Sequence, residues 1–219
     1  MTIKAVLFDM DGVLLDSEPL HSQINSEIYI KLGITVNNLM EHEFIGRYSS
    51  ERWKAIIDHF HLRQSVEELN DLQWRLLVDA LYVSGIQPSE GLKNLLSFLK
   101  KHNFRSSVAS SSKAVFVEAV MDYLDIRSDM DGYTSGDEVE KAKPEPDIFL
   151  LAADKLGVPS AECLVIEDSS AGVSAGKSAG MYVVGYDNHT SPGQDISKAD
   201  VIVRNLSDIR GILSKLNHL

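Results

Sequence analysis

Two patterns of apolar residues alternate along the chain, one typical of strands and the other of helices. Short, mostly apolar runs, typical of strands buried on both faces, occur at IKAVLF (3–8), SSVAS (106–110), CLVIE (163–167) and MYVVGY (181–186). Helical spacing of apolar residues is found in the segments 90–102, 113–124, 147–157 and 206–216. Strands that alternate with helices of this length predict βαβ units and a parallel sheet covered on both faces. We therefore expect an α/β fold with a doubly wound, Rossmann-like parallel sheet as its core.

One long segment breaks this alternation. Between the first strand and about residue 86 the apolar spacing is helical throughout, and no convincing strand pattern occurs. We therefore expect a helical domain at 17–86, inserted after the first strand, and an α/β core domain built from residues 1–16 and 87–219. Trp53 and Trp74 lie in this insert among apolar neighbours, and we interpret both as packing residues.

Composition and charge narrow the class of protein. The chain has 219 residues, of which 44% are hydrophobic, and a formal net charge of −11. The negative charge argues against nucleic acid or an anionic membrane surface as a partner, because both select a basic surface. No apolar run is long enough to cross a bilayer, and the first one is too short for a signal peptide. We expect a cytoplasmic protein without nucleic-acid or membrane partners, and the sequence carries no signal for its oligomeric state.

Acidic residues follow two of the predicted strands directly. Asp9 and Asp11 come after the first strand, and Glu167 and Asp168 end another. Alternate residues of an extended chain point the same way, so Asp9 and Asp11 can face one pocket, which Asp168 can join. Three carboxylates gathered in a small volume are costly unless a cation lies between them. Because Mg²⁺ prefers oxygen ligands and commonly engages a substrate phosphate, the sequence predicts a magnesium site for a small phosphorylated metabolite.

Phosphoryl transfer needs further groups, and the sequence offers them near other predicted strand ends. Asp9 can attack phosphorus as a nucleophile, and Asp11 can act as the general acid and base. Lys143 supplies a positive charge, while Ser110 and Ser111 supply hydrogen-bond donors for the phosphate. The presence of all these groups in one chain favours phosphate chemistry over an isolated acidic turn.

Four motifs carry a resemblance to a known family. FDMDGVLLDSEP, VASSSK, KAKPEPDIF and VIEDSSAGVSAGKSAGM, in this order, resemble the four motifs of the haloacid dehalogenase superfamily. The chain is most similar to the capped branch that contains β-phosphoglucomutase and sugar-phosphate phosphatases. The resemblance spans the whole chain, and the helical insert corresponds to the cap domain of that branch.

The resemblance implies a role for each motif residue. Asp9 would be the nucleophile and Asp11 the general acid and base. Mg²⁺ would be held by the Asp9 side chain, the backbone carbonyl of Asp11 and Asp168, with Glu167 bound to the ion directly or lying just behind its ligands. Asp11 also separates the chain from true dehalogenases, which do not keep this pair of aspartates.

Residues of the insert help to distinguish a hydrolase from a mutase. Ser49 falls where the mutase has an arginine for the distal phosphate, and Gln73 falls where it has a lysine. A mutase must hold a bisphosphorylated intermediate by both ends, so the loss of these cations favours hydrolysis. Other residues of the insert match or lie near the mutase's substrate-binding positions. These candidates for substrate contact are His21, Gly46, Arg47 and Arg52.

The favoured function is Mg²⁺-dependent hydrolysis of a small phosphate monoester, with a sugar phosphate as the first choice, through an aspartyl-phosphate intermediate. A β-phosphoglucomutase-type phosphosugar mutase is the alternative within the family. Outside enzymes, the alternative is a regulatory protein that accepts a phosphoryl group or binds a phosphosugar without turnover. A receiver of this kind has no helical insert after its first strand and does not need an acid at Asp11.

A nucleotide-binding protein with a P-loop is a further alternative. Residues 171–178, AGVSAGKS, fit a relaxed form of that motif. However, two residues separate this segment from the next apolar run, which leaves no room for the long helix that holds nucleotide phosphates. We interpret the segment as a short helix of small residues packed close to the sheet.

Overall fold

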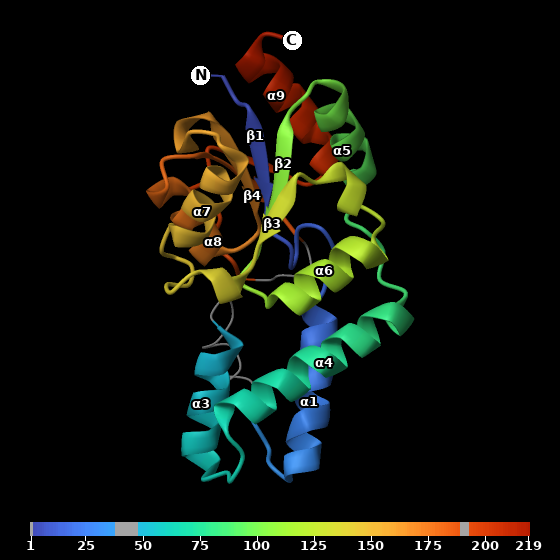
Figure 1. The fold of residues 1–219 in the computed structure, drawn as a ribbon, viewed down its shortest axis with the longest axis vertical. Coiled ribbons are helices and arrows are strands. Elements are labelled where there is room, and N and C mark those ends of the chain that lie inside the picture. The colour runs from blue at the N-terminus through green and yellow to red at the C-terminus, as the bar shows by residue number, and fades with distance from the viewer. Residues whose placement is uncertain (1, 38–47, 189–192) are drawn as a thin grey trace.

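The computed structural model describes residues 2–37, 48–188 and 193–219. Figure 1 shows an α/β part that contains both termini and, beyond the far end of its strands, a group of helices that projects away from the sheet. Within the described ranges, no helix combines the length and the apolar character that a membrane crossing requires.

The core is a single six-stranded sheet in which every neighbouring pair is parallel. Its strands are β1 (Ala5–Phe8), β2 (Arg105–Ala109), β3 (Gly132–Thr134), β4 (Cys163–Glu167), β5 (Tyr182–Tyr186) and β6 (Val201–Val203). The spatial order β3-β2-β1-β4-β5-β6 confirms the expected doubly wound sheet. The order reverses between β1 and β4, and ligands of such sheets bind beyond the carboxyl ends of the strands at this point.

Helices cover both faces of the sheet (Figure 1). One face packs against α5 (Leu92–Lys101), α6 (Ala114–Tyr123) and α9 (Ile209–Asn217), and the other against α7 (Asp147–Leu156) and α8 (Ser170–Ser178). Alternate residues of β1 supply the two cores: Val6 and Phe8 lie in the first, Ala5 and Leu7 in the second, and all four are fully buried. Burial on both faces explains why the strands read as unbroken apolar runs. Short 3₁₀ helices occupy Arg127–Asp129, Gly136–Glu138, Ser160–Glu162 and Leu206–Asp208.

Three helices lie between β1 and α5 in the chain and form the described part of the helical insert. They are α1 (Glu18–Leu32), α3 (Ser49–Phe60) and α4 (Val66–Ser84). Helix α4 begins with a capping box, in which Ser65 and Glu68 satisfy each other's backbone N–H groups, and it packs on α1, α3 and α6. The apolar core of the insert is continuous with one core of the sheet. The domain division at residues 17 and 86 therefore stays a prediction.

The edges of the sheet were not predicted. Strands β3 and β6 have three residues each, too few for a periodic pattern, and β3 begins with Gly132. The short helix of small residues is confirmed as α8. A Cβ atom on Gly176 of α8 would lie 2.8 Å from Cγ2 of Val183 in β5, so the glycine permits this close packing.

Candidate active site

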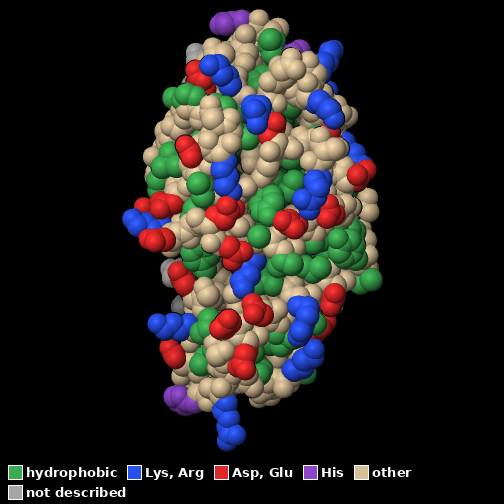
Figure 2. All heavy atoms as spheres, in the orientation of Figure 1, with side chains coloured by type: hydrophobic (Ala, Val, Ile, Leu, Met, Phe, Trp, Pro, Cys, Tyr) green, Lys and Arg blue, Asp and Glu red, His purple; other side chains and the backbone are tan. Residues whose placement is uncertain are grey.

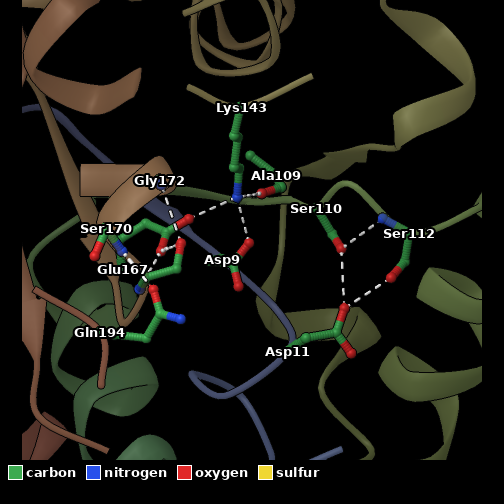
Figure 3. A network of polar contacts seen from close by, with 11 residues as sticks. Asp9, Asp11, Ala109, Ser110, Ser112, Lys143, Glu167, Ser170, Gly172 and Gln194 are labelled. Carbon is green, nitrogen blue, oxygen red and sulfur yellow. Dashed lines mark hydrogen bonds and ion pairs between the residues drawn. The ribbon is translucent and has the colours of Figure 1, made fainter. Parts of the chain in front are cut away.

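Asp9 occupies the first position after β1, at the point where the strand order reverses. Its N–H donates to the carbonyl of Ile166 in β4 over 3.0 Å, which fixes the backbone between the two strands. Its carboxylate accepts a hydrogen bond from Lys143, which also donates to Oε1 of Glu167 (2.7 Å) and to the carbonyl of Ala109 (3.3 Å). Figure 3 shows Lys143 reaching down between the two carboxylates.

Lys143 does not follow a strand directly, in contrast to the position proposed from the sequence. It lies on the loop between the 3₁₀ helix at 136–138 and α7, and only its side chain reaches the carboxyl edge of the sheet. Its ammonium group lies 4.8 Å from the centroid of the Phe149 ring. Burial would lower the pKa of Lys143, but the carboxylates of Asp9 and Glu167 raise it above its ordinary value. The buried lysine therefore stays charged and balances the acid around it.

The carboxylates of Asp9, Glu167 and Asp168 form a buried acidic cluster, with one oxygen of each within 4.8 Å of the others. Burial and the neighbouring carboxylates raise the pKa of Asp9 well above its ordinary value, against the lowering effect of Lys143. A hard divalent cation would relieve this repulsion, and carboxylate oxygens are the ligands that Mg²⁺ prefers. The donor set therefore fits a magnesium ion.

Two glycines make room for these carboxylates. Gly12 has φ +83°, and a Cβ atom there would lie 2.0 Å from Oδ2 of Asp168. A Cβ atom on Gly172 would lie 1.6 Å from Oε1 of Glu167. Both oxygens of Glu167 accept hydrogen bonds from protein groups, Oε1 from Lys143 and Oε2 from the N–H and hydroxyl of Ser169. Glu167 thus holds Lys143 and the loop after β4, and these bonds favour a place behind the metal ligands.

Asp11 points away from the acidic cluster, toward hydroxyl donors. Its Oδ2 accepts from the hydroxyls of Ser112 (2.7 Å) and Ser110 (3.4 Å), and its Oδ1 accepts from Ser17 and lies 3.4 Å from Nε2 of His21. Burial raises the pKa of Asp11, but the hydrogen bonds from His21, Ser17 and Ser112 outweigh it and lower the pKa. The structure therefore stabilises Asp11 as a carboxylate.

The loop after β2 supplies the serine donors. Ser110 is buried and its N–H donates to the carbonyl of Thr134 in β3 over 3.0 Å. Its hydroxyl also accepts from the N–H of Ser112, so the two serines support each other next to Asp11. Ser111 lies between them, and its carbonyl passes so close to Gly136 that a Cβ atom there would lie 2.2 Å away. The structure therefore places Ser110 next to Asp11, whereas the backbone of Ser111 packs against the neighbouring loop.

Two contacts of Asp11 were not predicted from the sequence. Ser17 is the N-cap residue of α1, and Ser112 lies two positions after Ser110. The spacing of Ser110 and Ser112 was the available signal, because alternate residues of an extended loop point the same way. Ser17 carried no such signal, because serine before a helix is ordinarily a cap.

Of the described insert residues proposed for substrate contact, the structure places only His21 in contact with the aspartates of the site. His21 on α1 contacts Asp11, while Arg52 on α3 is 9% exposed and places its guanidinium 5.2 Å from the ring centroid of Trp53. Nε and Nη2 of Arg52 have no hydrogen-bond partner among the described residues. Gly46 and Arg47 lie outside the described residues.

Other polar side chains of the insert bind one another. The hydroxyl of Ser49 donates to Oδ1 of Asn70, and Nε1 of Trp53 donates to Oε1 of Gln73 over 2.8 Å. Ser49 and Gln73 are the two residues that stand where the mutase has cations. In this chain they tie α3 to α4.

Comparisons with known proteins agree with this geometry. The family model described as haloacid dehalogenase-like hydrolase matches residues 3–180. The chain is 33% identical to the β-phosphoglucomutase of Bacillus subtilis, over 94% of this chain and 92% of that one. It is 28% identical to the phosphorylated carbohydrates phosphatase of Thermotoga maritima, over 82% of each chain. The crystal structure of CbbY from Rhodobacter sphaeroides in complex with phosphate superposes with a TM-score of 0.87 at 25% identity, covering 95% of this chain and 96% of that one.

Proposed function

Because the chain belongs to the haloacid dehalogenase-like hydrolase family, we propose that it hydrolyses a small phosphate monoester through a phosphoryl group carried on Asp9. The observation that supports this proposal is the position of the Asp9 carboxylate, which binds the ammonium of Lys143 and has an oxygen within 4.8 Å of an oxygen of Asp168. A nucleophilic carboxylate held beside one fixed cation and a fitting metal site is what displacement at phosphorus requires.

In the first step an Asp9 oxygen attacks phosphorus and the ester P–O bond breaks. The electron pair leaves with the alkoxide oxygen, which takes a proton from the carboxyl group of Asp11. Asp11 holds this proton from the water of the preceding turnover, and it binds the proton more tightly once the substrate draws the serine hydroxyls away from its carboxylate. Lys143 offsets the charge on the phosphoryl oxygens, and the hydroxyl of Ser110 donates to them. Ser110 and Ser112 donate to Asp11 in the structure. Substrate would therefore compete with Asp11 for these hydroxyls.

In the second step a water molecule attacks the phosphorus of the aspartyl phosphate. The Asp11 carboxylate accepts the proton of this water, and the bond between Asp9 and phosphorus breaks. Inorganic phosphate leaves and the Asp9 carboxylate is restored. The hydrogen bonds that lower the pKa of Asp11 suit this step, because they favour the carboxylate that accepts a proton.

Mg²⁺ is the proposed cofactor, and the residues proposed to hold it are Asp9, Asp168 and the backbone carbonyl of Asp11. When bound, the ion would neutralise charge on the phosphoryl group and keep Asp9 ionised. Glu167, engaged by Lys143 and Ser169, would orient the lysine.

Hydrolysis is preferred to the mutase reaction because the insert has replaced its expected cations. Ser49 and Gln73 bind Asn70 and Trp53 and offer no positive charge to a second phosphate. The 33% identity to a β-phosphoglucomutase over 94% of the chain keeps that reaction as the second candidate. Arg52, with two nitrogen atoms that have no partner among the described residues, is the residue of the insert that we propose for the distal end of the substrate.

The substrate class proposed is a sugar phosphate, because one relative of the chain is named as a phosphatase of phosphorylated carbohydrates. The test is a panel of phosphate esters incubated with Mg²⁺, with β-glucose 1-phosphate included with and without a bisphosphate primer. We expect repeated release of inorganic phosphate from at least one sugar phosphate, and none after chelation. Formation of glucose 6-phosphate without free phosphate would establish the mutase, and a single burst without turnover would establish a phospho-accepting regulator.

A further inference from the structure

Three aromatic rings meet where the helical insert rests on the sheet domain. The imidazole of His21 on α1 lies 6.0 Å from the ring of Trp74 on α4, at 86°, and 5.6 Å from the ring of Phe116 on α6, at 78°. Trp74 and Phe116 also contact each other, with centroids 5.6 Å apart. His21 is therefore packed edge to face against two rings that also contact each other, one from the insert and one from a helix that covers the sheet. Figure 1 shows these helices, α4 and α6, next to each other.

The two rings that contact His21, those of Trp74 and Phe116, are called the aromatic clamp below, and other contacts fix the position of each ring. Phe116 is fully buried in the core that α6 shares with the sheet. Trp74 is 5% exposed, and its Nε1 donates to Oδ1 of Asn70 over 3.2 Å. Oδ1 of Asn70 also accepts from the hydroxyl of Ser49 at the start of α3. The ring of Trp74 thus takes its orientation from the packing of α3 on α4.

The clamp bears directly on the reacting side chains. It leaves Nε2 of His21 facing Oδ1 of Asp11, 3.4 Å away. The imidazole is partly exposed at 17%. Without these two rings packed against it, the imidazole would be freer to rotate away from Asp11, because its outer torsion has broad minima.

Trp74 lies close to the surface at the junction of α4 and α6. Hydrophobic side chains reach the surface near the junction of α4 and α6 (Figure 2), and Val115 there is 53% exposed. A hollow of about 310 Å³ lies at this junction, and Trp74 and Val115 are among its lining residues. The ion pair of Asp71 on α4 with Lys113, 2.8 Å long, also crosses the junction. Trp74 therefore contacts His21 on one side and borders this hollow on another.

We propose that Trp74 and Phe116 are positioning residues, whose rings hold the imidazole of His21 against Asp11. The proposal rests on the function assigned to Asp11 above. Removing either ring should reduce turnover without comparable loss of substrate affinity.

The kinetic test compares Trp74→Leu and Phe116→Leu with Leu81→Ala, a control that opens a cavity in the same helix as Trp74. Leu81 is fully buried and is not one of the rings around His21. We expect each ring variant to lower kcat about tenfold or more with KM nearly unchanged, because misplaced catalytic groups cost rate. Trp74→Phe, which keeps a ring, should recover most of the rate. Equal loss in Leu81→Ala would mean that only stability had changed, and would overturn the proposal.

A double-mutant cycle separates positioning from general damage. In a His21→Gln background, Trp74→Leu should change kcat by no more than about twofold, because the residue through which it acts is already absent. A full tenfold loss in that background would show that Trp74 acts elsewhere. Should Trp74→Leu fail to fold, Phe116→Leu carries the same cycle.

A measurement without substrate makes failure of the clamp distinguishable from failure of the proposed function. The ¹⁵N resonance of Nε2 of His21, identified by its absence in His21→Gln, responds to the contact with Asp11 far more than to ring currents. It should shift in Trp74→Leu and Phe116→Leu and stay in place in Leu81→Ala. Unchanged resonances in both ring variants would overturn the proposal. Shifted resonances in a protein that hydrolyses no ester would support the clamp while rejecting the function.

Discussion

The carboxyl edge of the sheet and the helical insert use polar side chains in opposite ways. At the sheet edge, groups far apart in the chain converge on one buried place: Lys143 binds Asp9, 134 residues away, and Glu167. In the insert, polar side chains pair with one another and tie helices together, as Ser49 does with Asn70. The groups proposed for the reaction are therefore concentrated at the carboxyl end of the sheet, whereas these buried polar side chains of the insert are engaged in holding its helices together.

The largest effect on activity should come from a substitution at the carboxyl end of the sheet. Asp9→Asn should lower phosphate release by about 10³-fold or more, because the amide cannot form the covalent intermediate and nucleophile removal costs orders of magnitude. Phosphate release with Mg²⁺ present measures the effect, and circular dichroism checks that the fold is kept. A variant that retains more than about a tenth of the wild-type rate would exclude Asp9 as the nucleophile.

The second effect tests how tightly the carboxylates are packed. In Gly172→Ala the new methyl group would lie 1.6 Å from Oε1 of Glu167, so the carboxylate that holds Lys143 must move. We expect kcat to fall about 100-fold, since small displacements of catalytic groups are costly.

The matched control for that variant is Gly211→Ala on α9, where a Cβ atom meets nothing within 4 Å. It should leave kcat unchanged and raise stability by up to about 1 kcal/mol, as alanine does for glycine in a helix. Equal activity of the two alanine variants would show that the position of Glu167 does not matter for the reaction.

The third effect tests the insert. Arg52→Ala should raise KM about tenfold for sugar phosphates with a second anionic group and leave kcat nearly unchanged, because a contact remote from the reacting bond contributes to binding in both states. Arg75→Ala, on the exposed side of α4, is the control for loss of a positive charge. If both variants behave alike, Arg52 serves the packing of Trp53 and does not bind substrate.

The smallest effect lies away from both regions. Asp200 accepts from the N–H of Val183 (2.8 Å) and from Lys177. Burial raises its pKa, but the hydrogen bonds from Lys177 and Val183 outweigh it and lower the pKa below the ordinary value. The carboxylate therefore stabilises the fold at pH above the unfolded-state pKa of about 3.9, and this contribution is lost as the pH falls through the lower folded-state pKa.

Asp200→Asn should accordingly cost about 1 kcal/mol at pH 7. The difference from the wild type should shrink below about pH 4. Urea denaturation at several pH values measures both. A difference that is independent of pH would mean that the charge of Asp200 contributes nothing, and kcat should be the same in both proteins.

Much of the sheet edge could be predicted because each strand carries its own signal. Asp9 and Glu167 follow or end apolar runs, and the carboxyl ends of parallel strands meet by geometry. Lys143 was expected near a strand end, but a loop separates it from β3 and only its side chain reaches the site. Short edge strands such as β6 gave too few residues for any periodicity. Gly46 and Arg47 lie outside the described residues, so their proposed role remains a prediction.

The amino-acid order by itself determined the parallel sheet, the family and the carboxylates at the end of β1 and β4, because these depend on local periodicity and on residues that are neighbours in sequence. Only the tertiary structure decided how Asp11 is held and what surrounds His21. Ser112, Trp74 and Phe116 are all more than 50 residues away from Asp11 and His21 in the chain, and the contacts of Trp74 and Phe116 with His21 depend on how the insert packs on α6. Such packing is a property of the folded side chains together, which no single stretch of sequence records.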